Sequence, residues 1–225
     1  MAAISHDHKF IFIHTYKAAG SSIRKALEPF EYPNLAVRKA SKWIDLLLGA
    51  MGIKHPYKIS QIPLALRVYP MHIQAKELKT LLPAAIYDDY FKFAFVRNPW
   101  DWQVSLYHYI LETPHQFQHD LIKSFKDFDV YIRWRVEHDA RLQKDFITDD
   151  EGGSIVDFVG RFENINDDFS KICKMLSITT ALPHIKRSNH RDYRSYYSDE
   201  SANLISQAFR EDIDYFGYTF DPPSS

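Results

Sequence analysis

FIFIHTYKAAGSSI, residues 10–23, is the stretch that decides the fold. Its first half, FIFI, consists of apolar and β-branched residues and predicts a short buried strand. Its second half is small and hydroxyl-bearing and leads into RKALEPF, which has a helical pattern. The loop between strand and helix points backbone N–H groups and the positive end of a helix dipole outward, so we expect an anion to bind there. Lys17 adds a full positive charge beside it.

A second strand, turn and helix follow in YFKFAFVRNPWDWQVSLYHYI, residues 90–110. Phe91–Val96 predicts a strand, and the next helix has Asn98 as a good N-cap and Pro99 at its first position. We expect this helix to end near Glu112. Arg97 therefore lies at the carboxyl end of the strand, which is the edge of an open parallel sheet where ligands collect.

Two such units in one chain predict an α/β fold with a parallel sheet and with both polar turns on the same side. Residues 32–67 carry little recognisable chemistry and predict a packing or lid segment. Further helices are expected at 75–82, 117–146, 167–176 and 199–209, and a further strand within 154–162.

The composition suits one globular domain. The chain has 225 residues, of which 45% are hydrophobic and 25% charged, and domains commonly have roughly 100–200 residues. We therefore expect a single domain over residues 1–225. The net charge of −1 does not indicate a nucleic-acid binder or a membrane-surface binder, so an anion site has to come from local placement of charges.

The single cysteine, Cys173, rules out an internal disulfide framework and fits a reducing compartment. The N-terminal MAAISHDHKF lacks the apolar core of a signal peptide. The longest apolar run, WIDLLLGAMGI, is interrupted by Asp45 and is far shorter than the ~20 residues that a membrane span needs. We expect a cytoplasmic protein without a membrane span, although a chain trimmed of an anchor would have the same features.

His115 and His119 are one helical turn apart, a spacing that suits a pair of metal ligands. Metal sites need at least three well-placed ligands, and the sequence places no third ligand with this pair. We therefore expect a solvated helix face here, and no metal.

Several stretches resemble one enzyme family. TYKAAGSSI is similar to the 5′-phosphosulfate loop of sulfotransferases, usually written PKTGGTS or PKSGTT, and FAFVRNPWDWQVSLYHY closely resembles their 3′-phosphate motif, FVRNPWDRLVSLYHY. GRFENI, DYRSYYSDES and DIDYFGYTF resemble later segments of the carbohydrate-type group of this family. The resemblance extends from Lys9 to Phe220, and its specific part is RNPWD with Ser105 eight residues after Arg97.

The resemblance implies a three-layer P-loop-like fold, with a central, mainly parallel sheet flanked by helices. It also implies 3′-phosphoadenosine 5′-phosphosulfate (PAPS) as the sulfuryl donor, without a metal. This donor carries anions at two ends, so two separated binding turns are needed, and the chain supplies two. Sulfuryl transfer parallels phosphoryl transfer, in which positioning and charge stabilisation supply most of the acceleration.

By this resemblance, the first turn binds the 5′ end of the donor. Lys17 is a flexible point charge, which suits the bridging oxygen whose negative charge grows as the sulfuryl group leaves. Ala19 and Gly20 supply loop backbone, and the hydroxyls of Ser21 and Ser22 suit the 5′-phosphate at the helix start. The alternative for Lys17 is a surface lysine near a turn.

The second turn then binds the 3′-phosphate. The planar guanidinium of Arg97 suits bidentate capture of this group, and Ser105 adds a hydroxyl. The pairing of these two residues comes from the resemblance, because their spacing alone does not make them face each other. A strand-end salt bridge is the alternative for Arg97, and helix packing is the alternative for Ser105.

Three further residues and one aromatic complete the donor site that the resemblance implies. Phe162 takes the position of an aromatic that contacts adenine in related enzymes, with core packing as the alternative. Arg187, Ser188 and Arg191 resemble a loop that closes over the 3′-phosphate. Solvated charges are the alternative for this loop.

The first turn departs from the family pattern at two positions. Tyr16 replaces the usual proline, and Ala19 replaces the first glycine. Because positive φ is unfavourable for alanine, we expect the loop to adopt a conformation that alanine accepts.

A base should take the proton of the acceptor hydroxyl, and a histidine has a suitable pKa range. His72 is the first candidate, because MHIQAKEL resembles the GHxxA segment of the family. His14, at the end of the first strand, is the second. A structural histidine is the alternative for each.

We therefore expect a sulfotransferase that acts on a hydroxyl-bearing acceptor, either a carbohydrate, which we favour, or a small natural product. A non-catalytic nucleotide or sulfated-glycan binding protein is one alternative, and a P-loop kinase is another. The kinase is disfavoured because GxxxxGKS/T does not occur and Lys17 precedes the glycine instead of following it. The sequence contains no signal for the oligomeric state.

Overall fold

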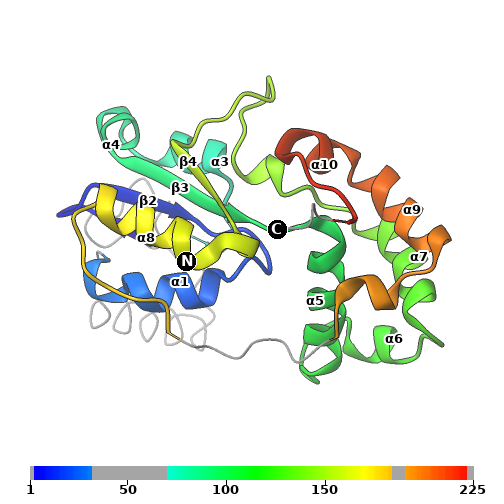
Figure 1. Cartoon of the computed structure of the whole chain (residues 1–225). Coiled ribbons are helices and arrows are strands. Elements are labelled where there is room, and N and C mark those ends of the chain that lie inside the picture. The colour runs from blue at the N-terminus through cyan, green and yellow to red at the C-terminus, as the bar shows by residue number, and fades with distance from the viewer. Residues whose placement is uncertain (1–2, 32–69, 184–190, 222–225) are drawn as a thin grey trace, which may run out of the picture.

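The fold is built on a four-stranded sheet with the strand order β1-β2-β3-β4 (Figure 1). The computed structural model describes residues 3–31, 70–183 and 191–221. The strands β2, β3 and β4 are parallel, and β1 is antiparallel to β2. The expected mainly parallel sheet is confirmed. The strands are β1 (Ala3–Ser5), β2 (Phe10–Ile13), β3 (Phe91–Val96) and β4 (Phe158–Arg161).

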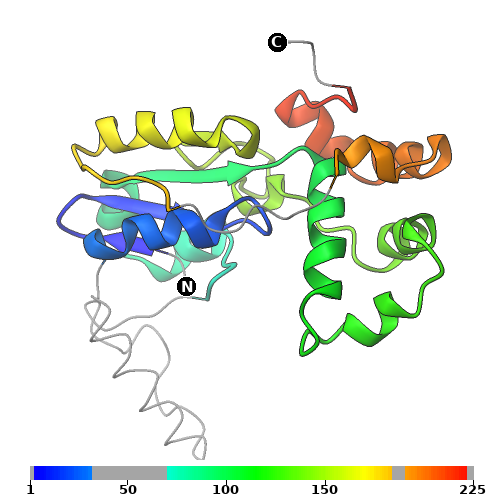
Figure 2. The same cartoon turned by 60° about the horizontal axis from the view of Figure 1, so that its bottom comes forward.

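Helices cover both faces of this sheet, so the expected three layers are confirmed (Figures 1 and 2). Alternate side chains of the strands point to opposite faces. Phe12 and Phe93 pack with the buried side chains of α1 (Gly20–Leu27) and α8 (Ile165–Met175). On the other face, Ile11, Ile13, Ala94 and Val96 pack with α3 (Ala75–Leu81) and α4 (Ala84–Asp89).

A group of helices lies beyond the carboxyl ends of the parallel strands (Figures 1 and 2). The helix α5 follows β3 directly, and the expected cap is present because the side chain of Asn98 accepts a hydrogen bond from the amide of Trp100 at 3.1 Å. The members of this group are α5 (Pro99–Leu111), α6 (His119–Lys123), α7 (Phe128–His138), α9 (Asp199–Ala208) and α10 (Arg210–Phe216). Short 3₁₀ turns occur at η1 (Glu28–Phe30), η4 (Lys144–Phe146), η5 (Phe162–Asn164) and η6 (Tyr193–Tyr196).

The prediction of one helix over residues 117–146 is wrong. The chain leaves α6 at Ser124, and Asp127 starts α7 by accepting a hydrogen bond from the amide of Val130 at 3.0 Å. Between α7 and η4 the chain forms no helix or strand. The strand expected within 154–162 is also shorter than predicted, since only Phe158–Arg161 pairs with β3.

The prediction of a solvated helix face is wrong for His119. Its side chain is buried, and Nδ1 lies 2.9 Å from the carbonyl oxygen of Ile110 at the end of α5. His115 is exposed, as expected. Over the described residues, no group of three histidine, cysteine, aspartate or glutamate side chains is arranged to hold a metal ion. The helices of residues 3–31, 70–183 and 191–221 include none long and apolar enough to cross a membrane.

Gly160 in β4 provides a test of the sheet packing. It pairs with Phe95 in β3, and a Cβ at this position would lie 2.5 Å from Cε1 of the Phe95 ring. Gly160→Ala should therefore destabilise the protein by about 1–3 kcal/mol through overpacking and lower the thermal midpoint by several degrees. Calorimetry of the purified variant measures this.

Gly153→Ala is the matched control, because its Cβ would lie 3.3 Å from the side-chain oxygen of the half-exposed Asp149, which can move aside. Equal thermal midpoints for Gly160→Ala and Gly153→Ala would contradict the close contact between β3 and β4.

Candidate functional site

The loop between β2 and α1 has an unusual backbone. Lys17 has φ 53° and Ala19 has φ 59° with ψ 17°, which is the left-handed region. The expectation that alanine at position 19 would keep the loop out of positive φ is wrong. Left-handed backbone costs about 1–2 kcal/mol for a non-glycine residue, so the tertiary contacts of this loop have to hold it.

Gly20 is needed where the loop enters α1. A Cβ at this position would lie 1.8 Å from Nε2 of His14, so the imidazole ring fills the space that any other side chain requires. Among the described residues, no side chain caps the start of α1. Its first amides therefore point out of the helix start, beside the exposed Ser21 and the half-buried Ser22. This is an arrangement that binds anions.

The side chain of Lys17 points from the loop toward α5. Its Nζ lies 4.2 Å from the centroid of the Tyr109 ring, a cation–π contact. Burial and, to a smaller extent, the positive charge of Arg97 lower the pKa of Lys17 to about 8, against an opposing effect of Glu112. Lys17 is thus a poorly hydrated cation close to a second one.

Arg97 lies at the carboxyl end of β3, as predicted, with only 4% of its surface exposed. Its Nε donates a hydrogen bond to Oδ2 of Asp101 at 2.7 Å, and Nη1 donates one to the carbonyl oxygen of Lys17 at 3.3 Å. The guanidinium carbon lies 3.9 Å from the centroid of the Phe162 ring. The structure therefore brings Lys17, Arg97 and Phe162 together from three separate segments.

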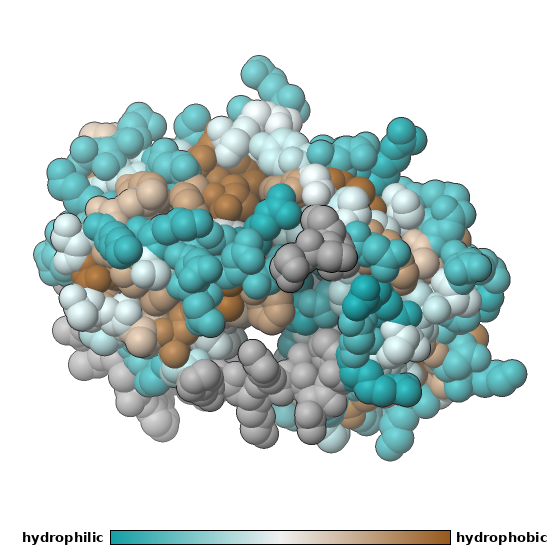
Figure 3. Space-filling model, viewed as in Figure 1, coloured by the Kyte–Doolittle hydropathy of each residue, from teal (hydrophilic) through white to brown (hydrophobic). Residues whose placement is uncertain are grey.

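Ser105 lies on the face of α5 that points toward this loop. Residues four apart in a helix share a face, and Ser105 is four residues from Asp101, which binds Arg97, and four from Tyr109, which contacts Lys17. Its side chain is buried. The space-filling view shows a hollow between the α1 side and the α5 side of the molecule (Figure 3).

The peptide group of Arg97 is held from behind by a buried amide. Oε1 of Gln143 accepts a hydrogen bond from the Arg97 amide at 2.9 Å, and Nε2 donates one to the Arg97 carbonyl oxygen at 2.8 Å. The carboxylate of Asp212 in α10 accepts hydrogen bonds from the amides of Gln143 at 2.8 Å and Lys144 at 2.9 Å. Burial raises the pKa of Asp212 to about 6, against the lowering effect of these hydrogen bonds.

The GRFENI segment connects β4 to the same region. Oε1 of Glu163 accepts a hydrogen bond from the Asn98 amide at 2.7 Å, and Oε2 accepts one from the Tyr218 hydroxyl at 3.2 Å. Glu163 therefore ties the start of α5 to the chain after α10, next to the Phe162 ring that contacts Arg97.

The tail residues are only partly described. Arg187 and Ser188 lie outside the described residues, as does the expected lid segment 32–67. The guanidinium carbon of Arg191 lies 5.5 Å from the centroid of the Tyr196 ring, and the Tyr196 hydroxyl lies 2.9 Å from Nε2 of His108 in α5. Arg191 therefore lies on the α5 side of the site.

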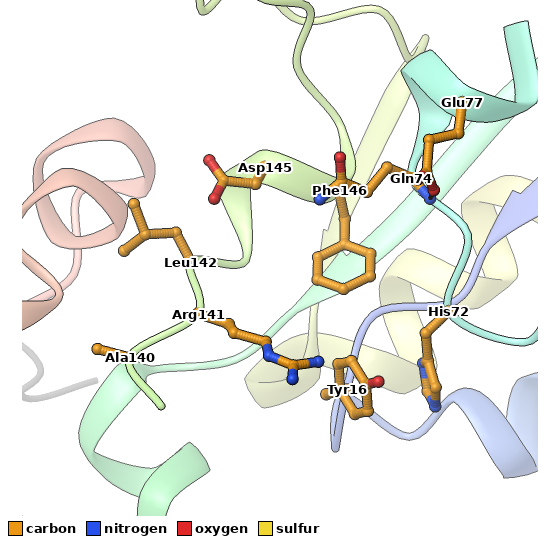
Figure 4. A pocket seen from close by; sticks show the side chains of 9 residues that line it. All are labelled: Tyr16, His72, Gln74, Glu77, Ala140, Arg141, Leu142, Asp145 and Phe146. Carbon is orange, nitrogen blue, oxygen red and sulfur yellow. Dashed lines mark hydrogen bonds between the residues drawn. The ribbon is translucent and has the colours of Figure 1, made fainter. Parts of the chain in front are cut away.

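A pocket of about 420 Å³ opens on the opposite side of the loop (Figure 4). It is lined by three rings, Tyr16, His72 and Phe146, and by Gln74, Glu77, Ala140, Arg141, Leu142 and Asp145. The rings of Tyr16 and His72 are stacked, with centroids 3.7 Å apart, and the Phe146 ring meets Tyr16 edge-on at 5.7 Å. Arg141 and His72 flank the Tyr16 ring on opposite sides (Figure 4).

The two candidate histidines differ in their surroundings. Nδ1 of His72 lies 3.0 Å from the carbonyl oxygen of His14. A carbonyl only accepts, so Nδ1 carries the hydrogen and Nε2 keeps its lone pair when the ring is neutral. Burial lowers the pKa of His72 below 6.5, partly offset by this hydrogen bond.

His14 is almost fully buried. Burial and the neighbouring His72 lower its pKa to about 3. Its Nδ1 has no hydrogen-bond partner within the part of the chain that the structure describes. His14 therefore fills the space beside Gly20, whereas His72 lines the pocket.

Several residues of this region escaped the sequence analysis. Gln143 and Asp212 carry no motif, and their side chains hydrogen-bond to backbone groups that are distant in sequence. Arg141 and Phe146 lay in a segment that the pattern assigned to a helix. Tyr16 was noticeable only as a departure from the family loop, and that departure was the available signal for the pocket.

Comparisons with known proteins found a family match and a similar solved structure. A model of the sulfotransferase family matches residues 1–219. Among solved structures, the chain is similar to the mouse sulfotransferase SULT7A1 complexed with PAP, at 15% sequence identity and a TM-score of 0.48, over 93% of this chain and 85% of that one. No curated protein sequence matches the chain.

The buried carboxyl behind Arg97 predicts a dependence of stability on pH. The pKa of Asp212 is raised from 3.8 in a free side chain to about 6 in the fold. Its contribution to stability is therefore fully present below pH 4 and is lost as the pH rises through 6. In Asp212→Asn this loss is absent. The free energy of unfolding of the wild type, relative to the variant, should fall by on the order of 2–3 kcal/mol between pH 4 and pH 7.

Urea unfolding at several pH values measures this difference in the free energy of unfolding. The altered hydrogen bonds of the variant add an offset that does not depend on pH, so it cancels when two pH values are compared. Asp214→Asn, which changes an exposed carboxylate on the same helix, is the control. Parallel pH profiles of the free energy of unfolding for the wild type and Asp212→Asn would show that the fold does not raise the pKa of Asp212.

Proposed function

The chain belongs to the sulfotransferase family, because the family model matches residues 1–219 of its 225 residues, and from this premise we propose that it transfers a sulfuryl group from PAPS to the hydroxyl of a carbohydrate. The acceptor oxygen attacks sulfur in line with the bond to the phosphate oxygen. That bond breaks, the phosphate oxygen leaves with its electron pair, and the proton of the hydroxyl passes to a base.

The donor half of this proposal rests on a pair of neighbouring cations, the buried Arg97 and the half-buried Lys17. Arg97 bonds to the Lys17 carbonyl at 3.3 Å, and its charge contributes to the lowered pKa of Lys17. Two positive groups gathered where water is scarce repel each other, and a polyanionic ligand between them relieves that cost. Asp101 accepts from Nε and the Lys17 carbonyl accepts from Nη1, so a phosphate would meet the remaining N–H groups of the guanidinium.

The surrounding groups fit both ends of PAPS. The uncapped start of α1, with Gly20, Ser21 and Ser22, would hold the 5′-phosphate through amides and hydroxyls. Arg97 and Ser105 would hold the 3′-phosphate on the α5 side of the hollow. The Phe162 ring already packs on Arg97 and would fix the guanidinium plane against the adenosine end.

Lys17 would act on the leaving group. Protonated Lys17 donates a hydrogen bond to the bridging oxygen as negative charge develops there. At neutral pH most molecules carry this proton, because the lowered pKa of about 8 remains above 7. The binding of a polyanion favours the charged form further.

His72 would act as the base. Its Nδ1 hydrogen is engaged with the His14 carbonyl, which leaves the Nε2 lone pair to accept the proton of the acceptor. Its pKa below 6.5 keeps the ring neutral at pH 7. His14 is less suited to this role, because it is closed off between Gly20 and His72 and is hard to protonate.

Two substitutions separate the roles of the cations. Arg97→Ala should weaken the binding of PAP, the product nucleotide, by about 10- to 100-fold, the value of one charge-assisted hydrogen-bond group. Lys17→Ala should bind PAP within a few-fold of wild type yet lose transfer from PAPS. Calorimetry with PAP and transfer of labelled sulfate from PAPS measure the two effects.

Arg133→Ala is the control, since Arg133 is an exposed cation on α7 paired with Glu200. Wild-type turnover by Lys17→Ala would refute its role at the leaving group, and an unchanged PAP affinity in Arg97→Ala would refute the 3′-phosphate role. PAP binding without transfer to any hydroxyl compound would instead indicate a non-catalytic binding protein.

The pH dependence of kcat/KM should have two limbs. Activity requires neutral His72 and protonated Lys17, so kcat/KM should fall below the lowered pKa of His72 and again above about pH 8. His72→Ala should remove the acid limb and lower kcat by about 10²- to 10⁴-fold. His115→Ala, an exposed histidine, is the control. An acid limb that persists in His72→Ala would assign the base to another group, with His14 the next to test.

A further inference from the structure

We propose that the pocket beside His72 binds the acceptor and that it selects an uncharged sugar. This inference rests on the proposed function and adds the location and the charge of the acceptor. The location follows from two consecutive residues. Lys17 points from the loop toward Tyr109 in α5, and Tyr16 points the other way, onto His72 and Phe146. The residue that would act on the donor, Lys17, and a residue that lines the pocket, Tyr16, are therefore adjacent in the chain.

The contacts of His72 also connect the pocket to the loop between β2 and α1. Its Nδ1 bonds to the backbone of His14 in the donor loop, and its ring lines the pocket. A hydroxyl bound in this pocket can meet Nε2 on the side away from that hydrogen bond. The pocket is therefore next to the base and to the loop that carries Lys17.

The size and the apolar lining of the pocket suit a sugar ring. Its volume of about 420 Å³ is within the range of about 300–1,000 Å³ that is typical of small-molecule sites. The Tyr16 and Phe146 rings meet at 78°; His72 stacks on Tyr16 and Phe146 is largely buried, so only part of each ring lines the pocket. The C–H face of a sugar ring is apolar and gains dispersion energy against such rings.

The polar lining argues against an acceptor without many hydroxyls. Gln74, Glu77 and Asp145 contribute amide and carboxylate oxygens at the rim, on either side of the Phe146 ring (Figure 4). An apolar acceptor such as a sterol would take water from these groups without replacing its hydrogen bonds, which is unfavourable. Sugar hydroxyls can donate to the oxygens and accept from the amide.

The charge balance of the pocket argues against an acidic sugar. Among the lining residues that the structure describes, Glu77 and Asp145 are carboxylates and Arg141 is the one cation, while the lowered pKa of His72 keeps that ring neutral. Nε of Arg141 is already paired with Oδ1 of Asp139 at 2.9 Å. A uronate would add a negative charge where negative charge is in excess, and like charges raise the free energy of binding.

The test compares matched acceptors with PAPS as the donor. Methyl glucoside and methyl glucuronide share a ring and differ in one group, CH₂OH or carboxylate, and further neutral sugars with their uronates extend the panel. We expect kcat/KM to be about tenfold higher for the neutral member of a pair, the effect of one unfavourable charge contact. Glu77→Gln combined with Asp145→Asn should reduce this ratio at least threefold, whereas Asp88→Asn on α4 should leave it unchanged.

A second variant tests the location. Ala140→Trp places a large ring at the exposed edge of the pocket, and it should raise KM for neutral sugars about tenfold or more while the affinity for PAP stays the same. Ala85→Trp, at an exposed position on α4, is the matched control. Because position 140 is exposed, the variant should fold, and an unchanged PAP affinity verifies this.

Each other outcome overturns the inference. Equal or better use of the glucuronide refutes the charge selection, and wild-type KM in Ala140→Trp refutes the location. Sulfation of sterols or phenols but of no neutral sugar refutes the acceptor class and leaves the proposed sulfuryl transfer standing. PAP binding without transfer to any compound refutes both the inference and the proposed enzymatic function.

Discussion

The burial of Arg97 at the carboxyl end of β3 is the constraint on which the rest of the site depends. A guanidinium cannot give up its charge, so it is tolerated inside a protein only where its donors are met. The chain meets two of them, from α5 through Asp101 and from the loop between β2 and α1 through the Lys17 carbonyl, and it covers the flat face with Phe162. Gln143 completes the peptide hydrogen bonds. Segments that are distant in sequence thus meet because one cation needs all of them.

The loop between β2 and α1 shows how such contacts override the local preference of the backbone. Lys17 and Ala19 both take left-handed backbone, at a combined cost of on the order of 2–4 kcal/mol if each costs about 1–2 kcal/mol. The hydrogen bond from Arg97 to the Lys17 carbonyl and the fit of His14 against Gly20 oppose relaxation of this turn. Strain of this kind persists where surrounding structure over-determines the backbone, and such places are commonly binding or catalytic sites.

The sequence was informative wherever a signal is local. The two strand–turn–helix units, the Asn98 cap and the position of Arg97 all follow from residues within one turn of each other, and the structure contains them. It was uninformative where tertiary contacts decide. The conformation of Ala19 depends on such contacts, and Gln143 and Asp212 are single polar side chains whose partners lie tens of residues away. The roles of Lys17 and Ser105 came from family resemblance, and they remain proposals.

The support behind Arg97 also constrains how the pocket can vary. Gln143 belongs to the segment 140–146, whose neighbouring side chains line the pocket, and Asp212 fixes the backbone of that segment from α10. The backbone of this segment is therefore committed to holding Arg97. Side chains that point from this segment into the pocket, such as Arg141, do not contribute to holding Arg97 and can change without moving it. Under the proposed function, acceptor choice can therefore diverge at these positions while the proposed donor site keeps its geometry, as long as Gln143 and Asp212 are retained.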